Sequence, residues 1–364
     1  MNHKILCDKL TYYGFRGKIN NLISSYLSNR TQYVSINGYD SKLLPITCGV
    51  PQGSTLGPLL FLLYINDLKY SLKYSTASHF ADDTCLLYAA RKTKSIESYL
   101  NYDLKNLSDW LHANRLSLNV TKTKLLLFHS KNDKTDYNTM NIKIEGFRLK
   151  FSDTVKYLEI TVDNNLSWDS HIGELSHKLS KANGIMSKLR LYISKTTLRS
   201  VYFALFYSHM NYGSLVWTLT TKKNLEKISI LQRKCIRIIN FLDYRDPTTN
   251  NFYTNKIIKF SDTIITNQLI LAYQFNNKQL PLDLKDLFVY SNEIHRYNTR
   301  CAITSMFHIP SIRSTHFGKK SLKFTVPQTL NTFSRVIPNI LSTKSKYSLK
   351  NLLNKHFLNL YKIQ

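Results

Sequence analysis

The spacing of apolar residues changes at Trp168, and this change constrains the fold more than any other feature of the sequence. Before Trp168, short alternating segments separated by turn residues predict strands with a few helices between them. After Trp168, apolar residues recur at intervals of three and four, which predicts a long helix with one continuous apolar seam. The seam consists of Ile172, Leu175, Leu179, Ala182, Met186 and Leu189. The sequence therefore predicts an α+β part followed by a mostly helical part.

The charge balance indicates a polyanionic partner. The 364 residues include 50 Lys and Arg against 23 Asp and Glu, a net charge of +27, while 43% of the residues are hydrophobic. This composition is typical of a folded protein of two or three domains and not of a disordered basic tail. Nucleic acid is the first candidate partner and an anionic membrane surface the second. After Glu293 the chain carries twelve Lys and Arg and no acidic residue, a segment that would repel itself without a polyanion.

Cysteine usage and hydropathy indicate an intracellular, soluble chain. The five cysteines are widely spaced and show neither a Cys-x-x-Cys pair nor the Cys/His spacing of a zinc site. The N-terminus lacks the apolar core of a signal peptide. The longest apolar run, residues 58–65, is far shorter than the ~20 residues that a membrane span needs. We therefore expect no membrane segment.

The part before Trp168 has a readable order of elements. Two short helices are expected within residues 4–27, with a break at Gly14 to Gly17. An Asn-Gly turn at positions 37 and 38 predicts a strand pair around it. A helix is expected over residues 96–111, and strands are expected over residues 125–129, 142–151 and 155–162.

A glycine-rich loop with Gly49, Gly53 and Gly57 leads into an apolar helix, with Ser54 or Thr55 near its cap. Glycines allow the backbone to approach a ligand closely, and a helix N-terminus offers unpaired amides to a phosphate. The alternative interpretation is a loop that only packs the start of the helix against the sheet.

Two adjacent carboxylates, Asp82 and Asp83, interrupt the apolar run of residues 79–88. The flanking residues predict a short buried hairpin, with both aspartates where the chain turns. Aspartate is common at turns because its side chain bonds nearby backbone amides. The alternative is that two carboxylates held close together serve to bind a divalent cation.

The helical part predicts further helices over residues 198–217, around residues 225–242 and around residues 264–275. The middle helix places apolar residues on one side and Lys223, Lys227, Lys234 and Arg237 on the other. Glu226 is the only acidic residue between Leu175 and Leu242. The cationic face is therefore either solvated or directed toward phosphates.

Taken together, the motifs resemble the reverse transcriptase of non-LTR (LINE-type) retrotransposons, and most closely the jockey-like group. Their order and spacing carry the resemblance. The matching segments are Gly49-Val50-Pro51-Gln52-Gly53-Ser54, Gly57-Pro58-Leu59-Leu60-Phe61, Tyr64-Ile65-Asn66-Asp67, Phe80-Ala81-Asp82-Asp83 and Asn119-x-x-Lys122-Thr123.

The resemblance implies an α+β fold with a right-hand polymerase palm, an antiparallel sheet with helices, followed by a helical thumb and a basic C-terminal region. We expect a partial palm over residues 1–165, the thumb over residues 166–245 and the mostly helical C-terminal region over residues 246–364. The function implied is RNA-directed DNA polymerase, a nucleotidyltransferase. Its partners would be an RNA template, a DNA primer and deoxynucleoside triphosphates. An active relative would work in a cytoplasmic ribonucleoprotein and in the nucleus.

The resemblance also assigns site residues. Asp82 would be a ligand of Mg²⁺, and Asp83 would support or share the metal site, because Mg²⁺ prefers carboxylate oxygens. Lys122 would approach the triphosphate and could donate a proton to the leaving pyrophosphate. The pocket for the incoming nucleotide and the template base would be lined by Pro51, Gln52 and Gly53. The helix carrying Lys223, Lys227, Lys234 and Arg237 would contact nucleic acid.

Two departures from the family pattern weaken the expected activity. The family's first motif, which ends in an aromatic residue and a metal-binding aspartate, lies upstream of the position that Met1 occupies. Glu159 stands where the family usually has glycine. We therefore expect an N-terminally truncated enzyme with little or no polymerase activity. The alternatives are a remnant that binds RNA or RNA–DNA hybrid without catalysis, and a chain that does not fold stably.

Overall fold

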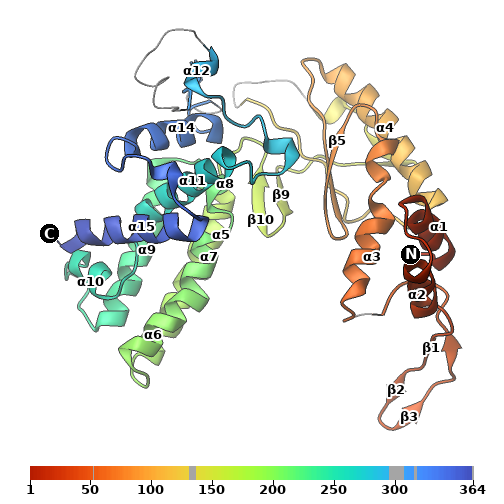
Figure 1. Ribbon diagram of the computed structural model, residues 1–364, viewed down its shortest axis with the longest axis horizontal. Helices are drawn as coiled ribbons and strands as arrows, with labels where there is room; N and C mark the ends of the chain where they lie inside the picture. The colour runs from red at the N-terminus through yellow and green to blue at the C-terminus, as the bar shows by residue number, and fades with distance from the viewer. Residues whose placement is uncertain (52, 131–136, 295–306, 315–317, 363–364) are drawn as a thin grey trace. The chain divides into compact units, whose positions relative to one another are not determined.

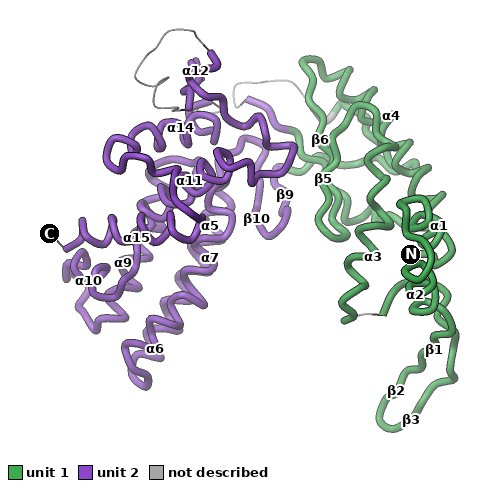
Figure 2. The backbone as a smooth tube through the Cα atoms, viewed as in Figure 1, with its two compact units in different colours: residues 1–127, 132–152 green, residues 128–131, 153–364 purple. Residues whose placement is uncertain are grey.

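The chain folds into two compact units (Figure 2). The computed structural model describes residues 1–51, 53–130, 137–294, 307–314 and 318–362. Unit 1 comprises residues 1–127 and 132–152, and unit 2 comprises residues 128–131 and 153–364. Both units combine helices with two-stranded antiparallel sheets, so the predicted α+β class is confirmed (Figure 1).

Unit 1 is built on helices α1 (His3–Tyr12), α2 (Lys18–Leu27), α3 (Leu56–Ile65) and α4 (Thr93–Ala113), with a 3-10 turn η1 (Leu68–Ser71). The break between α1 and α2 is at Gly14 and Gly17, both with positive φ, as the sequence predicts. Leu6, Leu10 and Leu60 are fully buried where α1 packs on α3. A second core lies under α4, against residues 140–149.

The strands of unit 1 form short hairpins. Strand β1 (Thr31–Gln32) pairs with β4 (Leu44–Pro45), and β2 (Ser35–Ile36) pairs with β3 (Tyr39–Asp40) around the predicted Asn37-Gly38 turn. Strand β5 (Thr76–Phe80) pairs with β6 (Asp83–Leu87), and β7 (Lys143–Ile144) pairs with β8 (Phe147–Arg148).

Two strand predictions for unit 1 are wrong. Residues 125–129 form no strand and make only a single bridge, between Leu125 and Phe151. Residues 142–151 form the β7–β8 hairpin and not one strand, because Glu145 and Gly146 adopt positive φ and turn the chain back.

The long segment of unit 2 starts with hairpin β9 (Thr154–Tyr157) and β10 (Ile160–Asp163), so the single strand predicted over residues 155–162 is wrong because the chain turns at Leu158 and Glu159. Helix α5 (Asp169–Leu189) follows. The apolar seam of α5 is buried as predicted and packs against α9 (Lys222–Asn240). The other helical segments are α6 (Lys195–Val201), the π-helical segment η3 (Tyr202–Tyr207), α7 (Ser208–Asn211), α8 (Ser214–Trp217), α10 (Thr249–Thr254), α11 (Phe260–Asn276), η4 (Leu282–Leu284), α12 (Ser291–Ile294), α14 (Leu322–Phe333), η5 (Ile340–Ser342) and α15 (Lys346–Lys362).

The helices expected as thumb and as C-terminal region share one hydrophobic core, which extends from Trp168 to Tyr361. The single helix predicted over residues 198–217 is wrong, since the chain breaks at Tyr212 and Gly213. Gly213 has a φ of +59°, and a Cβ at this position would clash with the side chain of Ile160. The break therefore lets the corner between α7 and α8 sit directly on β10.

Glu159 occupies the two-residue turn between β9 and β10 in a left-handed conformation, with a φ of +63° next to Leu158 at +47°. Its carboxylate lies 2.7 Å from Nζ of Lys156 and 3.9 Å from Nζ of Lys178. The pKa of Glu159 is lowered by the hydrogen bond from Lys156. Such exposed pairs contribute little to stability, whereas a side chain at this φ is strained.

We therefore expect Glu159→Gly to stabilise unit 2 modestly, because glycine adopts this turn conformation without strain. A Glu159→Val variant should be less stable than the natural chain, and Lys156→Gln should change stability little. Urea denaturation followed by tryptophan fluorescence reports on this unit through the buried Trp168 and Trp217. A Glu159→Gly variant that is less stable than the natural chain would show that the ion pairs outweigh the strain.

Candidate active site

The two adjacent carboxylates lie at the turn of hairpin β5–β6. Phe80 pairs with Asp83, so Ala81 and Asp82 form a two-residue turn and Asp83 begins β6. Ala81 has a φ of +52°, at a position where such turns favour glycine. Both carboxylates are exposed to solvent. The predicted position of the aspartates at the turn is confirmed.

The prediction that this hairpin is buried is wrong. Phe80 and Leu87 are more than half exposed, at 62% and 54%, and only one face of the hairpin is half-buried. On that face, Nδ1 of His79 lies 3.1 Å from Oγ1 of Thr84. Burial lowers the pKa of His79. The hairpin therefore presents its acidic turn to solvent next to a largely neutral imidazole.

The glycine-rich loop is fastened to the beginning of the chain. The amide of Gly49 donates to the carbonyl of Met1 over 2.7 Å, and Nε2 of His3 lies 2.8 Å from the carbonyl of Gly49. At the start of α3, Oγ of Ser54 accepts a hydrogen bond from the amide of Gly57, as a capping residue does. A Cβ on Gly57 would lie 2.9 Å from that oxygen, so a larger residue there would displace the capping hydroxyl.

Of the residues predicted to line the nucleotide pocket, Pro51 is half-buried and Gly53 is exposed with a φ of +77°. Gln52 lies outside the described residues. The described hydrogen bonds of this loop join Gly49 to Met1 and His3 and cap the start of α3. Gly53 remains exposed to solvent.

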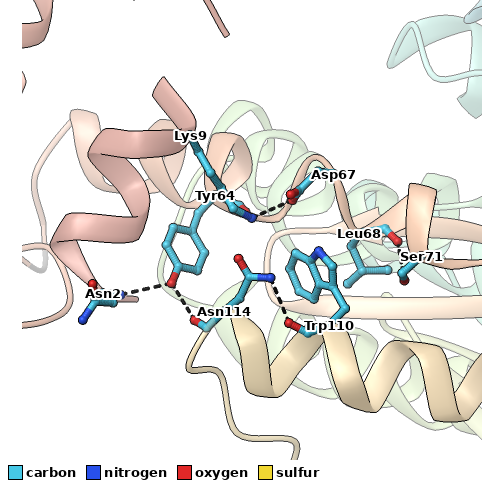
Figure 3. Close-up of polar contacts among 8 residues, drawn as sticks. All are labelled: Asn2, Lys9, Tyr64, Asp67, Leu68, Ser71, Trp110 and Asn114. Carbon is cyan, nitrogen blue, oxygen red and sulfur yellow. Dashed lines mark hydrogen bonds and ion pairs between the residues drawn. The ribbon is translucent and has the colours of Figure 1, made fainter. Parts of the chain in front are cut away.

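A lysine joins α1 to α3 and α4 (Figure 3). Nζ of Lys9 donates to the carbonyl of Tyr64 over 2.7 Å and to the carboxylate of Asp67 over 2.6 Å. It also lies over the rings of Tyr64 and Trp110, 5.0 and 4.7 Å from their centroids. The hydroxyl of Tyr64 donates to the carbonyl of Asn114 over 2.6 Å. The Tyr64–Asp67 motif therefore holds the helices of unit 1 together.

Asp103 is a site residue that the sequence analysis missed. It lies on the buried face of α4 with no exposed surface, and its carboxylate accepts hydrogen bonds from three consecutive amides. These are the amides of Lys73, Tyr74 and Ser75, at 2.9, 3.0 and 2.6 Å, directly before β5. An acidic residue within the apolar stripe of a predicted helix was the signal that could have revealed it. Asp103 fixes the chain that leads into the acidic hairpin.

Comparison of the sequence with known proteins identifies a family for the first part of the chain. Residues 1–162 match the family model described as reverse transcriptase (RNA-dependent DNA polymerase). This part of the chain belongs to the reverse transcriptase family. The family resemblance inferred from the loop, the hairpin and the lysine motif is thus confirmed.

The similar proteins come from non-LTR mobile elements. The RNA-directed DNA polymerase from mobile element jockey of Drosophila melanogaster is 28% identical over 67% of this chain and 27% of its own length. The probable RNA-directed DNA polymerase from transposon BS of the same species is 29% identical over 64% of this chain and 26% of its own length. A Pol polyprotein from retrotransposable element R1 of Bradysia coprophila is 26% identical, over 59% and 21%. The chain spans about a quarter of the length of these relatives.

The remaining predicted site residues lie apart from the hairpin in sequence. Lys122 of the reverse transcriptase domain is exposed on a turn, where its amide donates to Asn119. In unit 2, Lys223, Lys227 and Lys234 are exposed on α9. Arg237 of the same helix is half-buried, because its Nε donates to the carbonyl of Asp246 over 2.9 Å.

Asp82 and Asp83, adjacent at the turn of β5–β6, are the candidate metal ligands within the family motifs. Within the described parts of the chain, no group of three or more His, Cys, Asp or Glu side chains is arranged to hold a metal ion. Asp82 and Asp83 therefore supply two carboxylates of the kind that Mg²⁺ prefers, without a third ligand beside them. In the same described ranges, none of the helices has both the length and the apolar character needed to cross a membrane.

We expect Asp103→Ala to destabilise the reverse transcriptase domain by about 3 kcal/mol at pH 7, since three partly buried amides lose their buried acceptor. Burial alone would raise the pKa of Asp103, but the hydrogen bonds from Lys73 to Ser75 outweigh it and leave the pKa lowered. Because the pKa in the folded state lies below that in the unfolded state, about 3.9, the stabilisation is complete above this pH. It is lost as the pH falls through the folded-state pKa.

The measurement is the urea concentration at the midpoint of unfolding, for the natural chain and for Asp103→Ala, as a function of pH. Asp109→Ala is the control. Asp109 is an exposed carboxylate on the same helix, so its removal should have little effect. The difference in urea midpoint between the natural chain and Asp103→Ala should become smaller below pH ~4. If the two midpoints are equal at pH 7, or if their difference does not change with pH, this account of Asp103 is contradicted.

Proposed function

We propose that residues 1–165 form the palm of an RNA-directed DNA polymerase, with Asp82 and Asp83 as ligands of Mg²⁺. The observation that carries the proposal is the reverse transcriptase match over residues 1–162 together with two adjacent, exposed carboxylates at the hairpin turn. Two neighbouring carboxylates repel each other, and a divalent cation relieves that repulsion. Bound Mg²⁺ would neutralise the phosphate oxygens during nucleotide transfer.

Residues outside the hairpin would position the substrates. The exposed backbone at Gly53, with Pro51 and Gln52, would contact the incoming nucleotide and the template base, since glycine permits close approach. Lys122 forms no ion pair with any described residue, so its ammonium group is free to approach the triphosphate. A cationic acid near the leaving pyrophosphate can also donate a proton to it.

The metal site that we propose is incomplete within the described residues. A two-metal site needs bridging carboxylates, and among the described residues no group of three or more His, Cys, Asp or Glu side chains is arranged to hold a metal ion. Weak metal binding leaves phosphate charges unneutralised, and a loss of a few kcal/mol in the transition state lowers the rate by orders of magnitude. We therefore propose that this chain by itself is impaired as a polymerase.

Primer extension on an RNA template with a labelled DNA primer and Mg²⁺ tests the proposal. We expect the chain to extend primers at least ~100-fold more slowly than the same chain preceded by the family's segment with the aromatic-Asp motif. In the extended chain, Asp82→Asn with Asp83→Asn should abolish synthesis, whereas the exposed Asp109→Asn should not.

Two results would contradict the proposal. Equal rates for the two chains would show that the site is complete without the added segment. Full activity of the Asp82→Asn and Asp83→Asn variant would show that the hairpin turn does not hold the metal.

Binding of RNA–DNA hybrid without catalysis is the second candidate function, with residues 166–245 as a thumb and residues 246–364 as an accessory basic region. The observation that favours it is the row of exposed Lys223, Lys227 and Lys234 on α9. The one acidic residue of this helix, Glu226, is already paired with Arg233 at 2.6 Å. Arg237 is half-buried and its Nε donates to the carbonyl of Asp246, so it is less exposed than the three lysines.

If this face binds phosphates, replacing Lys223, Lys227 and Lys234 by Gln should weaken hybrid binding and lower the salt dependence of the affinity by about two to three phosphate contacts. Replacing Lys4, Lys18 and Lys42, which are also exposed, is the matched control. Fluorescence anisotropy at several salt concentrations measures both quantities. An equal loss of affinity in both triple variants would mean that only the net charge matters. Asp82→Ala should leave the affinity for the hybrid unchanged.

A further inference from the structure

Four tyrosines gather at the open end of hairpin β5–β6, and none of them has a part in the proposed catalytic function. Tyr74, Tyr99 and Tyr102 remain 37%, 39% and 48% exposed. The ring of Tyr74 lies 4.3 Å from that of Tyr99 and 5.6 Å from that of Tyr102, measured between centroids. Tyr88 lies 6.0 Å from Tyr99. We call these four residues the tyrosine platform.

The segments that lead into and out of hairpin β5–β6 at the tyrosine platform are rich in cations, while α4 carries Glu97 two residues before Tyr99. Nζ of Lys73 lies 5.4 Å from the ring centroid of Tyr74 and 6.0 Å from that of Tyr102. The two segments that carry Tyr74 and Tyr88, residues 68–75 and 88–96, contain no Asp or Glu. Their cations are Lys69, Lys73, Arg91, Lys92 and Lys94. Aromatic rings interleaved with unpaired positive charge suit a ligand that has both flat rings and phosphates.

The tyrosine platform is held in place before any ligand arrives. Asp103 binds the amides of Lys73, Tyr74 and Ser75, and Tyr99 and Tyr102 project from the same helix, α4. The carboxylate of Asp103 is fully buried under these amides, so it places no exposed negative charge near the rings. A rigid aromatic surface loses little conformational entropy when a ligand stacks on it.

We propose that the tyrosine platform stacks the bases of a single-stranded nucleic acid, with Lys73 near its phosphates. The rings remain partly exposed beside a lysine, an arrangement that suits base stacking next to phosphates. Tyr74 precedes β5 by two residues and Tyr88 follows β6 directly, so the platform lies at the end of the hairpin opposite Asp82. Five strand residues separate the two ends by about 17 Å. The hairpin thus carries a base-stacking surface at one end and carboxylates at the other.

Fluorescence anisotropy with labelled oligo(U) and oligo(dT), in the absence of Mg²⁺ and nucleotides, tests the proposal independently of catalysis. Replacing Tyr74 and Tyr102 by Leu should weaken binding of at least one of the two strands about tenfold or more, and the strand affected identifies the ligand as RNA or DNA. Replacing both by Phe should keep the affinity, because the stacking rings remain. Lys73→Gln should lower the salt dependence by about one phosphate contact.

Tyr12→Leu is the matched control, since Tyr12 is 88% exposed in the same unit and lies outside the platform. Circular dichroism of each variant confirms that it is folded. Unchanged affinity of the Leu variant for both strands would overturn the proposal. So would an equal loss in the Phe variant, or binding to anionic vesicles in place of the oligonucleotides.

Discussion

The carboxylate of Asp103 binds three consecutive backbone amides, and the acidic hairpin of this reverse transcriptase domain depends on that contact. Without it, the segment before β5 would leave three partly buried donors without their acceptor. The two-stranded hairpin has little core of its own, as its strands are at most half-buried. Its position is therefore set by the long helix α4, which carries both Asp103 and two rings of the tyrosine platform. One buried charge thus places a carboxylate pair and an aromatic surface at opposite ends of one hairpin.

The family motifs divide into structural and exposed parts. Asp67, at the end of the Tyr64–Asp67 motif, forms an ion pair with Lys9 (Figure 3). Gly57 leaves room for the hydroxyl of Ser54, which caps the start of α3. By contrast, Asp82, Asp83 and Lys122 are exposed and free of ion pairs among the described residues. The proposed function gives metal binding and proton transfer to these three exposed residues.

Sequence patterns predicted the elements that local physics determines. The seam of α5 follows from helical spacing, and the position of Asp82 and Asp83 follows from the need for a turn between two strands. The errors come from tertiary contacts that no local pattern contains. Residues 125–129 have the composition of a strand but find no partner strand among the described residues. The helix predicted over residues 198–217 is interrupted at Gly213, which lies against the side chain of Ile160.

Localised cleavage by Fe²⁺ bound in place of Mg²⁺ tests most directly whether the turn of β5–β6 holds the metal. With ascorbate and peroxide, bound Fe²⁺ generates hydroxyl radicals that cut the nearby backbone, and mass spectrometry locates the cuts. We predict cuts beside Asp82 and Asp83 that disappear in the Asp82→Asn and Asp83→Asn variant. Cuts centred on the groove lined by Glu97, Asp109 and Glu145, and unchanged in that variant, would contradict the account.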